Sequence, residues 1–312
     1  MIVLVAPGQG SQTPGFLTPW IDDPAARAQL EELSDASGVD LVAHGTSSDA
    51  DTIRDTAVAQ PLIVAAGLVT ARALFDRVDR SAVTGVAGHS VGELTAAALA
   101  GVVSEADAVS LVTVRASGMA DAAAAEPTGM SAVLGGDETE VLPKLAELGL
   151  EPANFNGGGQ IVVAGALDAL ARLAEEPPAK ARVIALQVAG AFHTRYMGSA
   201  VDPLRTAAAA IATSDPTTRL WTNFDGSEIA DGRRFVDLLV DQVASPVRWD
   251  RTMESFTAAG VTGLIELAPA GALVGLAKRG LKSPSGEKLP TVAIKTPDDL
   301  QAAVDLLQGA AS

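Results

Sequence analysis

Short runs of apolar residues alternate along the chain with longer segments in which apolar positions recur at helical spacing. Helices are expected in the longer segments: Pro24 after Asp23 marks the start of one, and Ser104 with Asp107 marks the start of another, which runs through about residue 125. This alternation is typical of an α/β protein with a parallel sheet. The predicted strands of that sheet cover residues 2–6, 83–87, 219–222, 263–267 and 290–294.

The segment from residue 126 to residue 188 has a different order of elements. It predicts a strand at 130–134, a helix at 138–148, strands at 152–155 and 160–164, a helix at 167–173 and a strand at 182–187. The order β-α-β-β-α-β is the split βαβ signature of a ferredoxin-like unit. We therefore expect an α/β core formed by residues 1–125 and 189–312, with residues 126–188 inserted as a ferredoxin-like subdomain.

Composition excludes several classes of function. The chain has 312 residues, no cysteine and a formal net charge of −16. The lack of cysteine excludes disulfides, zinc ribbons, iron–sulfur clusters and a cysteine nucleophile, and the negative charge opposes nucleic-acid binding. No 18-residue window is free of charges or turn formers, so no membrane span is expected. The first residues lack the basic region of a signal peptide, which favours a cytoplasmic protein.

The strongest chemical signal is the sequence GHSVGE at residues 88–93, directly after a predicted strand and at the start of an alanine-rich helix. This is the strand, sharp turn and helix of a nucleophile elbow. The turn should place Ser90 in a strained conformation, and the glycines on either side let the backbones pass closely. The helix N-terminus favours developing negative charge, so the backbone N–H of Val91 is a candidate oxyanion donor.

A serine nucleophile needs a base to take its proton at neutral pH. Of the three histidines, His89 is adjacent to Ser90 in a tight turn and should project elsewhere, and His44 lies in a polar loop. His193 follows an apolar run and precedes a helix, a strand-end position at which active-site residues gather in α/β folds. We predict that His193 is the base; the alternative is a lone buried histidine.

A second glycine-containing loop, PGQGSQ at residues 7–12, follows the first strand. A dinucleotide site would have a third glycine where this chain has Thr13, and then a helix, which Pro14 and Gly15 interrupt. We favour the interpretation that the backbone N–H of Gln9 points into the cleft as a second oxyanion donor. The alternative is a turn with only a structural role.

Together with four further matches in order along the chain, these motifs strongly resemble the malonyl-CoA:acyl carrier protein transacylases and the acyltransferase domains of polyketide synthases. The further matches are Arg115, Asn156 with Gln160, the run AFH at residues 191–193, and QV at 242–243 followed by SPVRW at 245–249. The resemblance implies an α/β hydrolase-like core with a parallel sheet and nucleophile elbow, plus the inserted ferredoxin-like subdomain. The chain departs from the family at residues 157–159, where three glycines replace a frequent proline.

The resemblance also implies residue roles. Ser90 and His193 form a dyad without an acid, Gln242 orients the histidine through its side-chain carbonyl, and Asn156 supports the site. Arg115 holds the free carboxylate of a malonyl group, since a guanidinium can donate two parallel hydrogen bonds to it. Phe192 before the histidine accompanies selection of malonyl over methylmalonyl groups.

The implied reaction is transfer of malonyl from malonyl-CoA to the phosphopantetheine thiol of an acyl carrier protein through a malonyl-serine, for fatty acid or polyketide synthesis. The CoA thioester is a substrate, and no metal or other cofactor is implied. Malonyl-CoA and the acyl carrier protein are both anionic. Basic residues near the cleft must therefore locally offset the net negative charge of the chain. Candidates are Lys180, Arg182, Arg195, Arg233, Arg234, Lys278 and Arg279.

Three other functions fit the sequence less well. A serine esterase or thioesterase-type hydrolase usually has its histidine near the C-terminus, but 119 residues follow His193. A patatin-like hydrolase could pair Ser90 with Asp225, which leaves His193 and Arg115 without roles. A non-catalytic module that binds the carrier protein would not need Ser90, His193 and Gln242 together.

Overall fold

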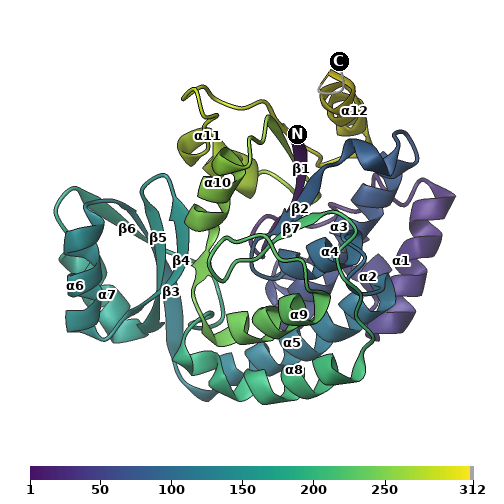
Figure 1. Cartoon of the computed structure of the whole chain (residues 1–312). Coiled ribbons are helices and arrows are strands. Elements are labelled where there is room, and N and C mark those ends of the chain that lie inside the picture. Colours follow the sequence, from purple (N-terminus) through teal and green to yellow (C-terminus); the bar gives the residue numbers. More distant parts are fainter. Residues whose placement is uncertain (310–312) are drawn as a thin grey trace.

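The computed structural model describes residues 1–309, which form two sheets and the helices that pack on them (Figure 1). The core sheet has five parallel strands in the order β10-β9-β1-β2-β7. They are β1 (Ile2–Ala6), β2 (Gly85–Gly88), β7 (Arg219–Trp221), β9 (Gly263–Glu266) and β10 (Thr291–Ala293). The five strands expected from the sequence are confirmed, and their ends lie within two residues of the expected ones.

Helices cover both faces of the core sheet, which is why β1 is apolar and buried at every position. Successive side chains of a strand point to opposite faces. Leu4 therefore packs in the larger hydrophobic cluster, whereas Val3 and Val5 pack in a second cluster with Phe256 and Leu273. The core helices are α1 (Pro24–Ser37), α2 (Leu41–Thr46), α3 (Thr56–Phe75), α4 (Gly92–Leu99), α5 (Glu105–Ala125), α8 (Gly198–Ala210), α9 (Gly232–Asp241), α10 (Trp249–Ala258), α11 (Ala272–Gly280) and α12 (Leu300–Gly309).

Helix α3 is buried at the centre of the larger cluster, against α4 and α5. Within residues 1–309 it is the one helix long and apolar enough to cross a membrane by length and composition. Of its most apolar window, 78% is buried inside the protein. The hydrophobicity of α3 is therefore accounted for by its place in the core.

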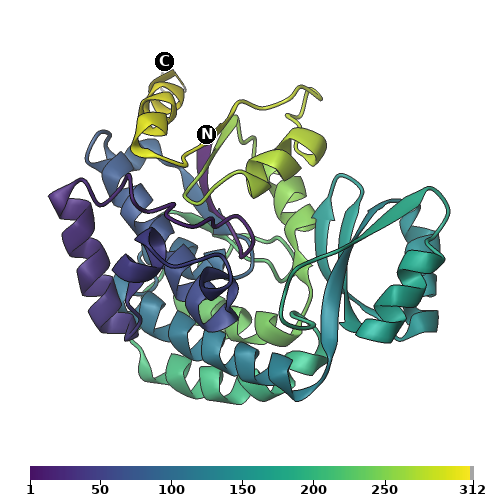
Figure 2. The same cartoon turned by 180° about the vertical axis from the view of Figure 1, so that it is seen from behind.

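The second sheet lies beside the core and has the order β6-β3-β5-β4-β8 (Figures 1 and 2). Its elements confirm the expected β-α-β-β-α-β order: β3 (Thr128–Gly135), α6 (Glu138–Leu148), β4 (Glu151–Gly157), β5 (Gln160–Ala166), α7 (Leu167–Glu175) and β6 (Ala181–Ala185). Both helices pack on one face of the sheet, where Val133, Leu145 and Leu173 form a third hydrophobic cluster. The other face turns toward the core (Figure 1).

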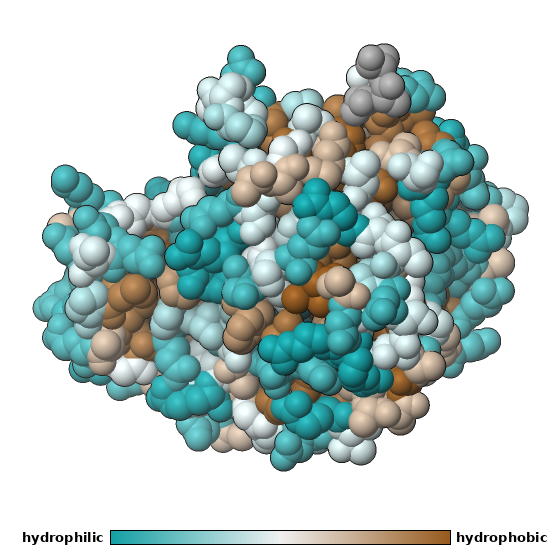
Figure 3. Space-filling view, in the orientation of Figure 1, coloured by the Kyte–Doolittle hydropathy of each residue, from teal (hydrophilic) through white to brown (hydrophobic). Residues whose placement is uncertain are grey.

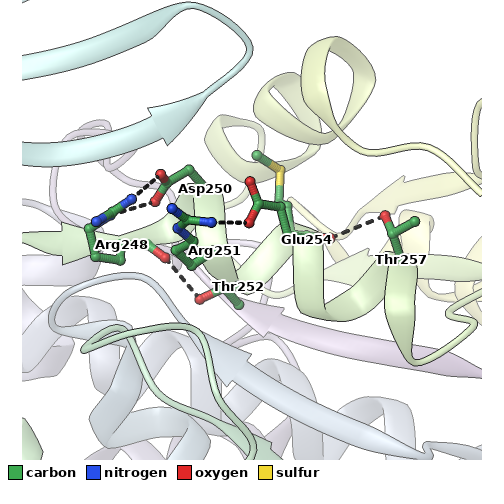
Figure 4. A network of polar contacts seen from close by, with 7 residues as sticks. Arg248, Asp250, Arg251, Thr252, Glu254 and Thr257 are labelled. Atoms are coloured by element: carbon green, nitrogen blue, oxygen red, sulfur yellow. Dashed lines mark hydrogen bonds and ion pairs between the residues drawn. The ribbon is translucent and has the colours of Figure 1, made fainter. Parts of the chain in front are cut away.

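The fifth strand of this sheet, β8 (Val247–Arg248), comes from the core segment and pairs in parallel with β4. The Arg248 guanidinium stacks over the Phe155 ring at 4.5 Å and forms a two-bond ion pair with Asp250 at the start of α10 (Figure 4). These contacts join the second sheet to the core. The boundaries 1–125, 126–188 and 189–312 stay a prediction, and the second sheet includes a strand from outside residues 126–188.

The face of the molecule seen in Figure 3 is mostly hydrophilic, with apolar residues in small patches, one of them over α6 and α7. This agrees with a net charge of −16 and with charged residues that cover helices buried on their other side.

The turn between β4 and β5 consists of three glycines with positive φ, 70° at Gly157, 58° at Gly158 and 76° at Gly159. The proline ring fixes φ at a negative value, so proline could occupy none of these positions. A Cβ on Gly158 would lie 3.0 Å from the Cβ of Arg279, whereas a Cβ on Gly159 would meet nothing closer than 4.0 Å. The turn therefore packs closely against the end of α11.

We expect Gly158→Ala to lower the melting temperature by several degrees more than Gly159→Ala. Both substitutions place an alanine at a positive φ, which makes them matched in backbone strain, but only the first presses on α11; overpacking of this kind costs about 1–3 kcal/mol. Thermal unfolding followed by circular dichroism measures the difference. Equal melting temperatures would show that the turn does not pack tightly on α11 in solution.

Candidate active site

Ser90 occupies the sharp turn between β2 and α4 with a φ of 53°, the strained conformation expected of a nucleophile elbow. The two flanking glycines have no room for a side chain. A Cβ on Gly88 would lie 2.0 Å from the carbonyl carbon of Gly92, and a Cβ on Gly92 would lie 2.2 Å from the backbone oxygen of Ala6. The turn therefore packs directly against the end of β1.

The structure brings Ser90 and His193 together. The Ser90 Oγ and the His193 Nε2 are 2.7 Å apart, and the His193 Nδ1 lies 2.8 Å from the backbone oxygen of Gln242. Nδ1–H donates to this carbonyl, which leaves Nε2 as the acceptor for the serine hydroxyl. Burial, with a further contribution from the charge of Arg115, lowers the pKa of His193 to about 3. The ring is therefore neutral at neutral pH and able to take a proton.

The expectation that Gln242 orients His193 through its side-chain carbonyl is wrong. The main-chain carbonyl holds the histidine, and the side-chain Oε1 instead accepts from Arg115 Nη2 at 3.0 Å. The Gln242 Nε2 donates to the buried carboxylate of Glu93. The reason is that a buried guanidinium and a buried carboxylate both need partners, and one amide supplies an acceptor to the first and a donor to the second.

Arg115 of α5 is 1% exposed and lies beside the nucleophile. Its Nη2 is 3.3 Å from the Ser90 Oγ, and its Nη1 donates to the Oε1 of Gln60 at 2.6 Å. Its Nε has no hydrogen-bond partner in the described part of the chain. Burial lowers the pKa of Arg115 to about 10, against the charge of Glu93, so the guanidinium stays positive at neutral pH.

Gln9 and Val91 line one cavity of about 450 Å³ together with Ser90 and His193. The Gln9 side chain donates to the backbone oxygen of Arg54 at 3.2 Å. Within residues 1–309, neither the Gln9 nor the Val91 backbone N–H has a hydrogen-bond partner. Two free N–H groups beside a nucleophile are suited to bind an oxyanion.

His89 points away from Ser90, as expected, and toward the second sheet. Its Nε2 is 2.9 Å from the Oδ1 of Asn156, whose Nδ2 donates to Gln160 at 3.2 Å, and its ring meets Trp249 edge-on. Burial lowers the pKa of His89. Asn156 thus contacts His89 and not the dyad.

The rest of the cavity is largely apolar. Phe192 is 7% exposed and lines it beside His193. Other apolar lining residues come from α5, the second sheet, the segment directly after β6, and α11: Met119, Met130, Val162, Leu186 and Leu276. Of the basic residues considered for a local positive patch, Arg279 lines the cavity, whereas Arg195 is paired with Glu151.

Three buried polar residues of the site were not identified from the sequence: Gln60, Glu93 and Asn223. Asn223 accepts from the Ser90 N–H at 2.7 Å and donates to the backbone oxygen of Gly88 at 2.7 Å. Each has a weak signal in the sequence. Gln60 interrupts an apolar helix, Glu93 begins one, and Asn223 follows a strand.

Comparisons with known proteins agree with this geometry. The family described as acyl transferase domain matches residues 3–311. The chain is similar to the malonyl CoA-acyl carrier protein transacylase of Mycobacterium tuberculosis, with 52% identity over 98% of this chain and 100% of that protein. It is also similar to the enzyme of the same name from Escherichia coli K12, with 33% identity over 97% of this chain and 98% of that protein.

Solved structures show the same fold. The crystal structure of MCAT from Mycobacterium tuberculosis matches with a TM-score of 0.92 at 52% identity, over 96% of this chain and 98% of that one. A malonyl-transacylase solved in complex with a holo type II PKS acyl-carrier protein matches with a TM-score of 0.90 at 30% identity, over 98% of this chain and 99% of that one. The hydrolase-like α/β fold is therefore shown for this chain.

The lowered pKa of His193 predicts how stability depends on pH. Between about pH 3 and the ordinary value of 6.5, the unfolded chain binds a proton at this residue that the folded protein does not, so the free energy of unfolding falls as the pH falls. Glu93, whose pKa burial raises, acts in the opposite sense.

We expect His193→Gln to reduce the loss of stability between pH 6.5 and pH 4.5, measured by urea unfolding at both values. His89→Gln should reduce it as well, because burial also lowers the pKa of His89. An unchanged difference between the two pH values in His193→Gln would mean that His193 is charged in the folded protein.

Proposed function

Because the chain belongs to the acyl transferase domain family, we propose that it transfers the malonyl group from malonyl-CoA to the phosphopantetheine thiol of an acyl carrier protein, through a malonyl ester on Ser90. One observation carries this proposal. The Ser90 Oγ lies 2.7 Å from a neutral histidine nitrogen and 3.3 Å from a buried guanidinium. A base and a carboxylate-binding group on one nucleophile suit an acyl group that bears a free carboxylate.

In the first half-reaction, Ser90 Oγ attacks the thioester carbonyl carbon while His193 Nε2 takes the hydroxyl proton. The carbonyl oxygen becomes an oxyanion between the N–H groups of Gln9 and Val91. When the tetrahedral intermediate collapses, the bond from carbon to sulfur breaks, and His193 returns its proton to the CoA thiolate. The Gln242 carbonyl stabilises the imidazolium while His193 carries the serine proton, because Nδ1–H points at it.

In the second half-reaction, the phosphopantetheine thiol gives its proton to His193 and attacks the acyl-serine. The same N–H groups bind the second oxyanion, and the proton passes to Ser90 Oγ as the ester bond breaks. The product is a malonyl thioester of the carrier protein, for use in fatty acid or polyketide synthesis. Kinetics should be ping-pong, because one residue carries the acyl group between two substrates.

Arg115 binds the malonyl carboxylate in this scheme. Its Nε is the buried donor without a protein partner, so a carboxylate can complete its hydrogen bonding. Phe192 selects against a methyl group on the α-carbon: with the carboxylate held at Arg115 and the carbonyl held over Ser90, that carbon has little freedom to move.

Proton transfer, oxyanion binding and carboxylate binding are all assigned to protein groups, and we propose that the reaction uses the CoA thioester as substrate without a metal or further cofactor. We further propose that the enzyme acts in the cytoplasm, with residues 126–188 as a subdomain that closes one side of the cleft. The hydrolase alternative is not favoured. Its candidate partner Asp225 accepts from the Ser227 N–H, and His193 Nδ1 meets a carbonyl instead of an acid.

We expect Ser90→Ala to take no malonyl group from malonyl-CoA, since loss of a nucleophile lowers turnover by up to about a millionfold. Intact-mass spectrometry detects the adduct on the native enzyme and its discharge by holo carrier protein. Ser110→Ala, at an exposed serine of α5, is the control and should be acylated normally. A malonyl adduct on Ser90→Ala would place the nucleophile elsewhere.

We expect malonyl-CoA to be preferred over methylmalonyl-CoA by about 10- to 200-fold, the usual range for one carbon in a pocket. Phe192→Ser should reduce that preference, because it removes the ring that the added methyl would press against. A competition assay with both donors measures this. Equal use of the donors by the native enzyme, or an unchanged preference in the variant, would exclude Phe192 from selection.

A further inference from the structure

Glu93 is a buried carboxylate at the centre of the site that the reaction scheme does not use. It lies in the first turn of α4, three residues after the nucleophile, and is 1% exposed. One of its oxygens accepts from the backbone N–H of Asn223, and the other accepts from Gln242 Nε2. A carboxyl group is seldom buried so completely without a partner of opposite charge or a function.

The contacts of Glu93 determine which way the Gln242 amide faces. An ionised carboxylate can only accept hydrogen bonds, and a guanidinium can only donate them. The Gln242 amide lies between Glu93 and Arg115, so its Nε2 must face Glu93 and its Oε1 must face Arg115 Nη2. Gln242 Nε2 also donates to the Ser90 backbone oxygen at 3.3 Å and to Asn223 Oδ1 at 3.4 Å, but the Glu93 carboxylate is the nearest of its three acceptors. Loss of the carboxylate would therefore remove the strongest contact that holds the amide in this orientation.

The interposed amide also keeps Arg115 available. Among the ion pairs of residues 1–309, none joins Glu93 directly to Arg115. The negative charge still stabilises the buried guanidinium, yet no protein carboxylate occupies the donors that a substrate carboxylate would use. A direct salt bridge would compete with the substrate for the same N–H groups.

Burial raises the pKa of Glu93 to about 8, although the hydrogen bond from Asn223 and the charge of Arg115 oppose that rise. The contacts favour the ionised form, because each of the two oxygens faces an N–H donor. Protonation would also displace an N–H donor from one of the two oxygens, both of which accept a hydrogen bond. Asn223 connects Glu93 to the nucleophile, because its backbone N–H donates to Glu93 and its Oδ1 accepts from the Ser90 N–H.

We propose that Glu93 is a positioning residue for the transfer reaction, and that its carboxylate acts through the Gln242 amide to orient the Arg115 guanidinium toward the carboxylate of the substrate. This rests on the proposed function, in which Arg115 binds malonyl. Glu93 acts on Arg115 and does not touch the reacting atoms. Its loss should therefore affect donors that carry a carboxylate more than donors that lack one.

The test is a double-mutant cycle with Glu93→Gln and Gln242→Met, read as the ratio of kcat/KM for malonyl-CoA to that for acetyl-CoA. Glu93→Gln places two N–H donors face to face and should lower this ratio about 10- to 100-fold, mostly through the KM for malonyl-CoA. Gln242→Met should lower it similarly, while its main-chain carbonyl still holds His193. The double variant should lose at most about twofold more than the worse single variant.

The matched control is Glu266→Gln. Glu266 is another buried carboxylate, but it accepts only backbone N–H groups at the start of α11. Its variant should lose stability without a change in the malonyl-to-acetyl ratio. Thermal unfolding of each variant separates a loss of folding from a loss of selectivity.

Additive effects of Glu93→Gln and Gln242→Met, or equal losses with both donors in Glu93→Gln, would overturn the proposal. If Glu93→Gln does not fold as a single variant, the double variant is compared with Gln242→Met. The malonyl-to-acetyl ratio of these two should differ by less than about twofold. A tenfold or larger further loss in the double variant overturns the proposal. A native enzyme that takes no malonyl group from malonyl-CoA would refute the proposed function and this proposal with it.

Discussion

The close approach of α4 to the end of β1 determines where the site can form. A Cβ on Gly92 would lie 2.2 Å from the backbone oxygen of Ala6, so only glycine allows the helix to start against that strand. The contact places the turn after β2 directly beside the loop after β1. Because β7 is the next strand, the residues that follow it reach the same point, and Asn223 holds the Ser90 N–H. The carboxyl ends of three neighbouring parallel strands thus position the loop that contains Gln9, the nucleophile Ser90, and Asn223, which binds the Ser90 N–H.

Beneath this turn, three ionisable side chains are buried together, and neutral amides separate them. Gln60 and Gln242 accept from Arg115 through their side chains. Glu93 accepts from the Gln242 side chain and from the backbone N–H of Asn223. Charges in such an interior interact strongly, and each must be hydrogen-bonded to remain ionised. An amide accepts a hydrogen bond from a cation through its oxygen and donates one to an anion through its N–H, and it carries no net charge. The site therefore holds a guanidinium, a buried carboxyl group and a neutral imidazole close together, and the partners that hydrogen-bond them add no further charge.

Local patterns in the sequence predicted the strands, the order of the second sheet and the turn at Ser90, because each depends on residues close together in the chain. His193 was found by elimination among three histidines. The partners of these residues were harder to predict, because they depend on contacts between distant positions. Glu93 and Gln242 are 149 positions apart, and β8 begins at Val247, whereas the other strands of its sheet all end by Ala185. The Gln242 side chain was misassigned because nothing in the sequence shows that its amide lies between Glu93 and Arg115.

The position of β1 also constrains the order in which the chain can fold. As the central strand, β1 pairs with β2 on one side and, on the other, with β9, which comes near the end of the chain. During synthesis one edge of β1 therefore stays open until β9 has been made. The first four strands of the second sheet all lie between Thr128 and Ala185, so their contacts are far more local and can form while the core sheet is incomplete. The dyad, which needs residues 90, 193 and 242, is assembled only late in translation.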